Sequence, residues 1–66
     1  MQLEINGTPH ILPSTCTIAE LLTHLRLVPE TVLIEHNGIA LHRHEWITIA
    51  LAEGDRIEIL QVAAGG

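Results

Sequence analysis

The last four residues of the sequence, Ala63, Ala64, Gly65 and Gly66, could do chemistry through one group, the α-carboxylate of Gly66. An α-carboxyl group titrates at about 3.5, so it is ionised at neutral pH and can attack a phosphorus centre. Glycine has no Cβ and lets the backbone approach a nucleotide pocket closely, and four residues reach at most ~14 Å when extended. We therefore predict a tail that can thread a narrow channel, although small residues at a terminus are also typical of a frayed end.

A metal site is the second chemistry that the residue types allow. His42 and His44 on a strand would share one face, with Glu45 nearby. No third ligand is fixed by spacing, and the other histidines, His10, His24 and His36, belong to separate predicted elements. Cys16 precedes a helix start, where the helix dipole can lower a thiol pKa, but without a partner base a small buried or half-buried residue is expected. We predict surface histidines, no metal and no cofactor.

Length and charge limit what these groups can do. A chain of 66 residues buries only about 60% of the surface that it exposes when unfolded, which argues against a self-contained enzyme. Eight carboxylates, three arginines and no lysine give a net charge of −5. The chain lacks the basic footprint of a nucleic-acid-binding protein, and the charge favours a protein partner with a basic docking surface.

The sequence predicts neither a membrane span nor a signal peptide. The apolar runs are shorter than the roughly 20 residues of a transmembrane helix, and no basic stretch precedes an apolar block near Met1. The single cysteine cannot form an intramolecular disulfide, which suits a reducing compartment. We expect a cytoplasmic protein that is monomeric when free.

The first half of the chain predicts a hairpin and a helix. Residues 1–5 alternate as a strand, Asn6-Gly7 predicts a tight turn, and residues 8–12 return as an edge strand because they contain Pro9. Thr17-x-x-Glu20 predicts a capping box at a helix start. The helix has one apolar stripe, formed by Ile18, Leu21, Leu22 and Leu25. Arg26 is expected in its last turn, where a cation is favourable.

The second half predicts three more strands. Residues 32–36 lead into Asn37-Gly38, a second hairpin turn, and residues 39–41 return. Residues 42–47 are expected to form a turn or one helical turn, and residues 56–62 alternate again as the final strand. One helix on a four- or five-stranded mixed sheet is the two-layer α+β arrangement that a short chain can close. We expect the first and last strands side by side at its centre.

Strand parity predicts a second functional surface beside the tail. If Ile57 and Ile59 face the helix, then Leu60 and Val62 point outward, and Leu33 joins them from the neighbouring strand. An exposed apolar patch next to a reactive end is typical of a docking site, although scattered surface aliphatics need no explanation. The predicted organisation is a domain over residues 1–62, bearing this partner-binding patch, and a flexible tail over residues 63–66.

A series of short motifs runs through the whole chain. It comprises the start from Met1 to Gly7, the Asn37-Gly38 turn followed by Arg43 and Trp46, the segment from Glu53 to Ile59, and Gly65-Gly66. In this order they resemble the β-grasp, ubiquitin-like fold and, more closely, the sulfur carrier proteins of thiamine biosynthesis, the ThiS family. That family usually shows Val-Pro before the arginine and a small polar residue after it, where this chain has Leu41-His42 and His44.

The resemblance implies a carrier rather than an enzyme. A ubiquitin-activating-like, ATP-dependent adenylyltransferase would adenylate the Gly66 carboxylate. Sulfur from a desulfurase system would then replace AMP and leave a thiocarboxylate on Gly66. Thiazole synthase would receive this sulfur for the thiazole ring of thiamine.

Other functions stay open on the sequence alone. The small subunit of molybdopterin synthase shares the fold and the Gly-Gly thiocarboxylate, although that family tends to be longer. A carrier for another sulfur-containing metabolite fits the same residues. Alternatives from other classes are a protein modifier that conjugates to lysines and a small histidine-based metal-binding module.

Overall fold

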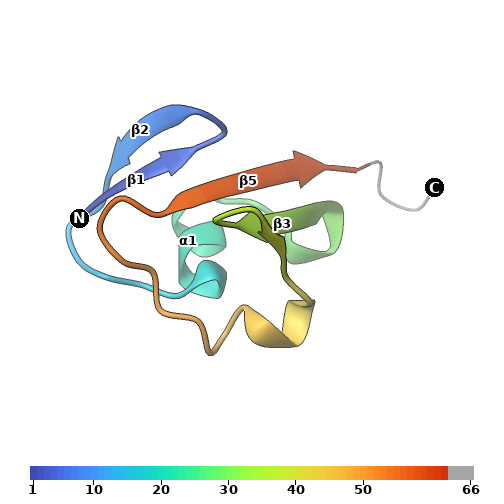
Figure 1. Cartoon of the computed structure of the whole chain (residues 1–66). Coiled ribbons are helices and arrows are strands. Elements are labelled where there is room, and N and C mark those ends of the chain that lie inside the picture. Colours follow the sequence, from blue (N-terminus) through green and yellow to red (C-terminus); the bar gives the residue numbers. More distant parts are fainter. Residues whose placement is uncertain (63–66) are drawn as a thin grey trace.

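The computed structural model describes residues 1–62, which form one α-helix, five β-strands and two 3-10 turns (Figure 1). In chain order these are β1 (Gln2–Ile5), β2 (Thr8–Ile11), α1 (Ile18–His24), η1 (Pro29–Thr31), β3 (Val32–His36), β4 (Ile39–Ala40), η2 (Arg43–Glu45) and β5 (Arg56–Gln61). All the predicted strands and the predicted helix are present. The predicted tail, residues 63–66, lies outside the described residues.

The strands form one mixed sheet in the order β2-β1-β5-β3-β4. β1 and β5 are parallel neighbours at its centre, with Ile5 opposite Ile57, and the other pairs are antiparallel. The prediction that the first and last strands pair is confirmed. β2, which contains Pro9, is an edge strand as predicted, because proline cannot donate a ladder hydrogen bond.

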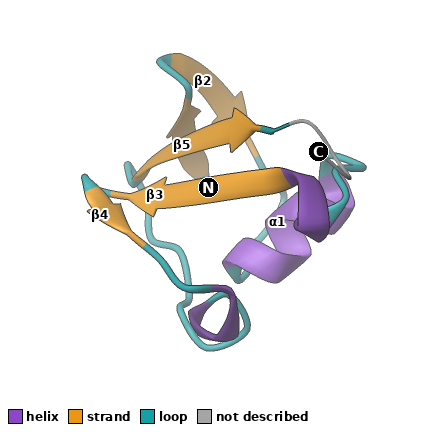
Figure 2. Cartoon of the chain, turned by 90° about the vertical axis from the view of Figure 1, so that its right-hand side faces the viewer, coloured by secondary structure: helices purple, strands orange, loops and turns teal. Residues whose placement is uncertain are grey.

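The helix packs on one face of the sheet, and the two layers enclose the core (Figure 2). The core is aliphatic apart from one tryptophan and consists of Leu3, Ile5, Leu12, Ile18, Leu21, Leu22, Val32, Ile34, Trp46, Leu51 and Ile57. Strand residues of the other parity are exposed on the opposite face of the sheet. We call this the outer face, and it carries Gln2, Glu4, Leu33, Glu35, Arg56, Glu58 and Leu60.

The helix starts as predicted. The Thr17 hydroxyl accepts a hydrogen bond from the Glu20 N–H at 3.2 Å, and the Glu20 carboxylate accepts one from the Thr17 N–H at 2.9 Å. This reciprocal capping box satisfies two donors that the first turn would leave unpaired. With seven residues α1 is short, and no helix within residues 1–62 has the length and apolar composition to cross a membrane.

The end of the helix differs from the prediction. α1 ends at His24 with Leu25 as its cap, so the expectation that Arg26 lies in the last turn is wrong. Arg26 has a left-handed φ of 59°, and the Leu27 N–H donates back to the Leu22 carbonyl at 2.9 Å. This is a Schellman motif with arginine at the position where glycine is usual, and the helical spacing of apolar residues does not reveal it.

Candidate functional site

The candidate site is centred on β5, because this strand leads to the predicted tail. β5 lies between β1 and β3, and the Val62 N–H, one residue beyond it, still donates to the Thr31 carbonyl at 2.7 Å. The chain is thus held in the sheet up to the last described residue. Ala63, Ala64, Gly65 and Gly66, the predicted threading and modified residues, lie outside the described residues, and their roles remain predictions.

The first hairpin asparagine extends the pairing of β1 with β5. Asn6 adopts a left-handed φ of 50° at the turn. Its side-chain Oδ1 accepts from the Ile59 N–H at 2.7 Å, and its Nδ2 donates to the Ile59 carbonyl at 3.1 Å. The amide group therefore acts like one more peptide unit of β1 and satisfies both backbone groups of Ile59.

The second hairpin asparagine holds the other end of the same strand. Asn37 also has a left-handed φ, of 51°. Its Oδ1 accepts from the Arg56 N–H at 2.8 Å, and its Nδ2 donates to Asp55 Oδ1 at 3.2 Å. From the sequence, both asparagines are predicted only as turn residues. Their hydrogen bonds to the final strand could have been predicted only from the position of the two Asn-Gly turns, which follow the two strands that flank it.

Asp55 anchors the turn that leads into β5. Its Oδ2 accepts from the Ala52 N–H at 2.9 Å and lies 2.8 Å from His36 Nε2, and both side chains are largely buried. Burial acts to raise the pKa of Asp55. Hydrogen bonds from His36, the Ala52 N–H and Asn37, together with the charge of His36, outweigh it and hold the pKa below its usual value.

This lowered pKa predicts a pH dependence of stability. Because the folded pKa of Asp55 lies below its unfolded value of about 3.9, the ionised carboxylate stabilises the fold above that value, and the stabilisation is lost as the pH falls through the folded pKa. We expect the urea midpoint of the wild type to fall between about pH 4.5 and pH 2.5. In Asp55→Asn this part of the decline should be missing. Parallel pH profiles for the two proteins would contradict the assignment.

The predicted docking patch lies on the outer face, at the end of β5 that leads to the tail. Leu33 and Leu60 are direct cross-strand partners, and their side chains are 58% and 62% exposed. Val62, two residues further on, is also exposed. The two leucines border a hollow of about 450 Å³ that Ala40 and Leu41 also line. We call Leu33, Leu60 and Val62 the apolar patch, and its role in binding remains a prediction.

The two closely spaced histidines lie at a 3-10 turn and not on a strand, which agrees with the turn or single helical turn expected over residues 42–47. His42 caps η2 and His44 lies within it, and their rings stack with centroids 5.6 Å apart and planes 6° from parallel. Within residues 1–62 no group of three histidine, cysteine, aspartate or glutamate side chains is placed to hold a metal ion. The described geometry therefore gives no support to the metal-binding alternative.

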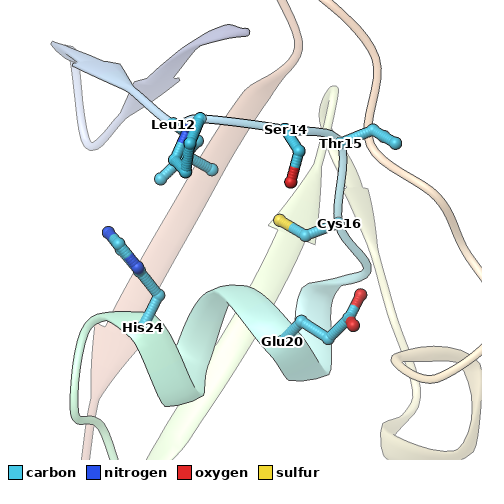
Figure 3. A pocket seen from close by; sticks show the side chains of 7 residues that line it. Leu12, Ser14, Thr15, Cys16, Glu20 and His24 are labelled. Carbon is cyan, nitrogen blue, oxygen red and sulfur yellow. The ribbon is translucent and has the colours of Figure 1, made fainter.

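Cys16 lines a hollow of about 190 Å³ between the segment before α1 and the helix itself. Figure 3 shows its sulfur beside Ser14, with Glu20 and His24 extending from successive turns of α1. Burial, and then the charge of Glu20, raise the pKa of the Cys16 thiol. The helix start therefore does not lower the pKa of this thiol, and its half-buried position agrees with the expected buried or half-buried residue.

One helix packed on a mixed sheet with parallel first and last strands at its centre defines the β-grasp, ubiquitin-like class. The sequence profile of the ThiS family matches residues 2–66, and the chain belongs to that family of sulfur carriers. The crystal structure of a thiamine biosynthesis protein (ThiS) from Geobacter metallireducens is similar with a TM-score of 0.86 and 32% identity, covering 100% of both chains. A solution structure of a thiamine biosynthesis protein from the same organism gives 0.84 at 32% identity, covering all of this chain and 88% of that one.

Two further relatives match this chain over different shares of their own length. A thiazole synthase from Magnetococcus marinus is 33% identical over 66 residues, which are 100% of this chain and 20% of that protein. An uncharacterized protein, ycf40, from Trieres chinensis is 26% identical over 62 residues, covering 94% of this chain and 85% of the relative. The chain thus spans about a fifth of the length of the thiazole synthase that it matches.

Proposed function

We propose that this protein carries sulfur for thiamine biosynthesis as a co-substrate of partner enzymes and is not itself a catalyst. The observation that carries the proposal is the match to the ThiS family over residues 2–66, which includes the Gly65-Gly66 end. The small β-grasp domain and the central position of the strand that leads to this end support it.

The proposed chemistry takes place on Gly66. Its carboxylate oxygen attacks the α-phosphorus of ATP, and pyrophosphate leaves with the electrons of the broken P–O bond. The resulting acyl adenylate is a mixed anhydride. A persulfide supplied by a desulfurase system then attacks the acyl carbon through its terminal sulfur, and AMP leaves with the electrons of the C–O bond. A thiol such as cysteine cleaves the resulting acyl disulfide, so that a thiocarboxylate remains on Gly66 and the thiol ends in a disulfide with the former persulfide carrier. Ala63, Ala64 and Gly65 are small enough for the chain to reach a buried nucleotide.

An ATP-dependent adenylyltransferase of the ubiquitin-activating type is the proposed activating partner. The apolar patch supports docking, because Leu60 is exposed on β5, the strand that leads to the tail, and Leu33 is exposed opposite it on β3. Exposed apolar groups that become buried at an interface centre contribute much of the binding energy. Because the activation consumes ATP, we place it in the cytoplasm.

Thiazole synthase is the proposed sulfur acceptor. The relative from Magnetococcus marinus that is named thiazole synthase contains a segment similar to this whole chain within one-fifth of its length. A carrier segment and a thiazole synthase in one polypeptide would be held at a high effective concentration. This observation favours thiazole synthase over the molybdopterin alternative as acceptor.

Intact-mass spectrometry tests the proposal. The protein is incubated with ATP, a cysteine desulfurase, cysteine and the adenylyltransferase from the same cell, with a matched reaction that lacks ATP as control. The expected result is a gain equal to the mass difference between sulfur and oxygen, located on Gly66 by fragmentation and dependent on ATP. An unchanged carboxylate at Gly66 under these conditions would refute the proposed function.

A further inference from the structure

The carboxylates of the chain divide into two groups. Five of the eight have a partner within residues 1–62. They are Glu20 and Glu45, which cap turns, Glu30, which pairs with Arg43, Glu53, which accepts from the Gln2 N–H, and Asp55. The other three, Glu4, Glu35 and Glu58, have no hydrogen-bond or ion-pair partner among the described residues, and all three lie on the outer face.

Two of these three glutamates face each other directly. Glu35 on β3 is the cross-strand partner of Glu58 on β5, and the next pair on the same face is Leu33 with Leu60. Directly opposed side chains have Cβ atoms about 5 Å apart, and like charges in this position destabilise a sheet. The fold thus keeps an unfavourable charge pair immediately beside the apolar patch.

Arg56 is the one cation among the outer-face residues, and it lines a hollow of about 220 Å³ together with Glu4, Glu35 and Glu58. Arg56 neighbours Glu4 in the parallel pairing and lies two residues before Glu58 on β5. Among the described residues, however, no ion pair joins Arg56 to any of these carboxylates. The three glutamates and Arg56 together give this part of the outer face a net charge of −2.

We propose that the outer face is a two-part docking surface for the adenylyltransferase. The Leu33–Leu60 pair receives an apolar side chain of that enzyme, and the Glu35–Glu58 pair receives an arginine guanidinium next to it. The inference rests on the proposed function and adds the chemistry of the partner. It also assigns a role to a like-charge pair whose removal should stabilise the carrier on its own.

Charge and geometry favour a guanidinium as the occupant. A guanidinium is planar and offers five donors in a fixed fork, so that it can bridge two carboxylates on adjacent strands. Binding then replaces a repulsion with two charge-assisted hydrogen bonds next to a desolvated apolar contact. A second copy of this chain is disfavoured, because two such faces would bring like charges together.

The test compares the wild type with variants in which glutamine replaces glutamate, so that a charge is removed while the shape of the side chain is kept. In Glu35→Gln/Glu58→Gln the shape is kept, and we expect the Kd for the adenylyltransferase to rise roughly tenfold or more at low salt, through slower association and through faster dissociation once the charge-assisted hydrogen bonds are lost. The difference should shrink at about 0.5 M salt, where charges are screened within a few ångströms. The melting temperature should rise by roughly 2–4 °C, because a like-charge pair is lost. Weaker binding with higher stability is a combination that a merely structural role would not produce.

Two further variants sharpen the test. Glu20→Gln removes one carboxylate from the helix side of the molecule, where glutamine still completes a capping box, and its Kd should match the wild type, whereas Glu35→Gln or Glu58→Gln alone should already weaken binding. Glu58→Lys gives Glu35 a partner within the sheet, so the melting temperature should rise further and binding should weaken beyond the glutamine variants.

Failure of this inference is distinguishable from failure of the proposed function. If the wild type gains its thiocarboxylate and the folded double variant binds with unchanged affinity, the docking inference is overturned and the carrier function stands. If millimolar Mg²⁺ raises the melting temperature of the wild type and not of the double variant, the pair binds a metal ion and the inference is also overturned. If the adenylyltransferase does not activate the wild type, both the proposed function and the docking inference are refuted.

Discussion

Leu60→Asp is expected to weaken binding to the adenylyltransferase by about 100-fold, or about 2.7 kcal/mol, while the domain stays folded. Leu60 is exposed on the outer face opposite Leu33, so the substitution removes little buried surface from the domain itself. In the complex, however, a carboxylate would have to be desolvated at the centre of an apolar contact. Sulfur loading at carrier concentrations below the Kd should fall by the same factor. The measurement is a calorimetric or fluorescence titration of the adenylyltransferase.

The matched control is Ile47→Asp. Ile47 is also strongly exposed, but it belongs to no strand and does not line the hollow beside Leu33 and Leu60. The same apolar-to-acidic change at this position should leave the Kd within about twofold of the wild type, since surface aliphatics outside an interface contribute little. Equal affinities of the wild type and Leu60→Asp, both folded by circular dichroism, would remove the apolar patch from the docking surface.

The sheet face on which the apolar patch lies was predictable from the sequence. The cross-strand partners on that face were not. Alternation along a strand has a period of two, so Leu60 had to be exposed once Ile57 and Ile59 were assigned to the core. The direct opposition of Leu33 to Leu60, and of Glu35 to Glu58, depends on the register between β3 and β5. That register joins segments separated by a long connection, and no local pattern specifies it.

The local elements of the fold followed from local chemistry. The capping box, the two Asn-Gly turns and the helical stripe each depend on contacts within a few residues, and the structure confirms them. The bonds from Asn6 to Ile59 join residues 53 positions apart, and those from Asn37 also reach across the sheet. Their acceptors and donors become known only when β5 is placed between the two hairpins.

Ile57→Ala is expected to destabilise the domain by about 3–4 kcal/mol, a larger loss of stability than any substitution on the outer face should cause. Ile57 has 0% exposure, lies opposite Ile5 on the central strand and packs in the layer beneath α1. The substitution removes buried methyl and methylene groups and leaves a cavity that the surrounding strands can fill only in part. A single core of this size rarely supplies more than about 5 kcal/mol. The variant should therefore be partly unfolded at 37 °C, which urea denaturation followed by circular dichroism would measure.

Two controls separate packing from docking along the same strand. Ile57→Val removes one methylene group and should cost only about 1 kcal/mol. Leu60→Ala, three residues further along β5 but on the outer face, should cost less than about 1 kcal/mol in stability while weakening binding to the adenylyltransferase. If Leu60→Ala destabilised the domain as much as Ile57→Ala, the outward face of β5 would contribute to stability as strongly as the inward face, and the assignment of the outward face to partner binding alone would be wrong. The inward side chains of β5 stabilise the domain by packing in the core. Its outward side chains can therefore be suited to binding a partner, even where they include an opposed glutamate pair that is unfavourable in the sheet alone.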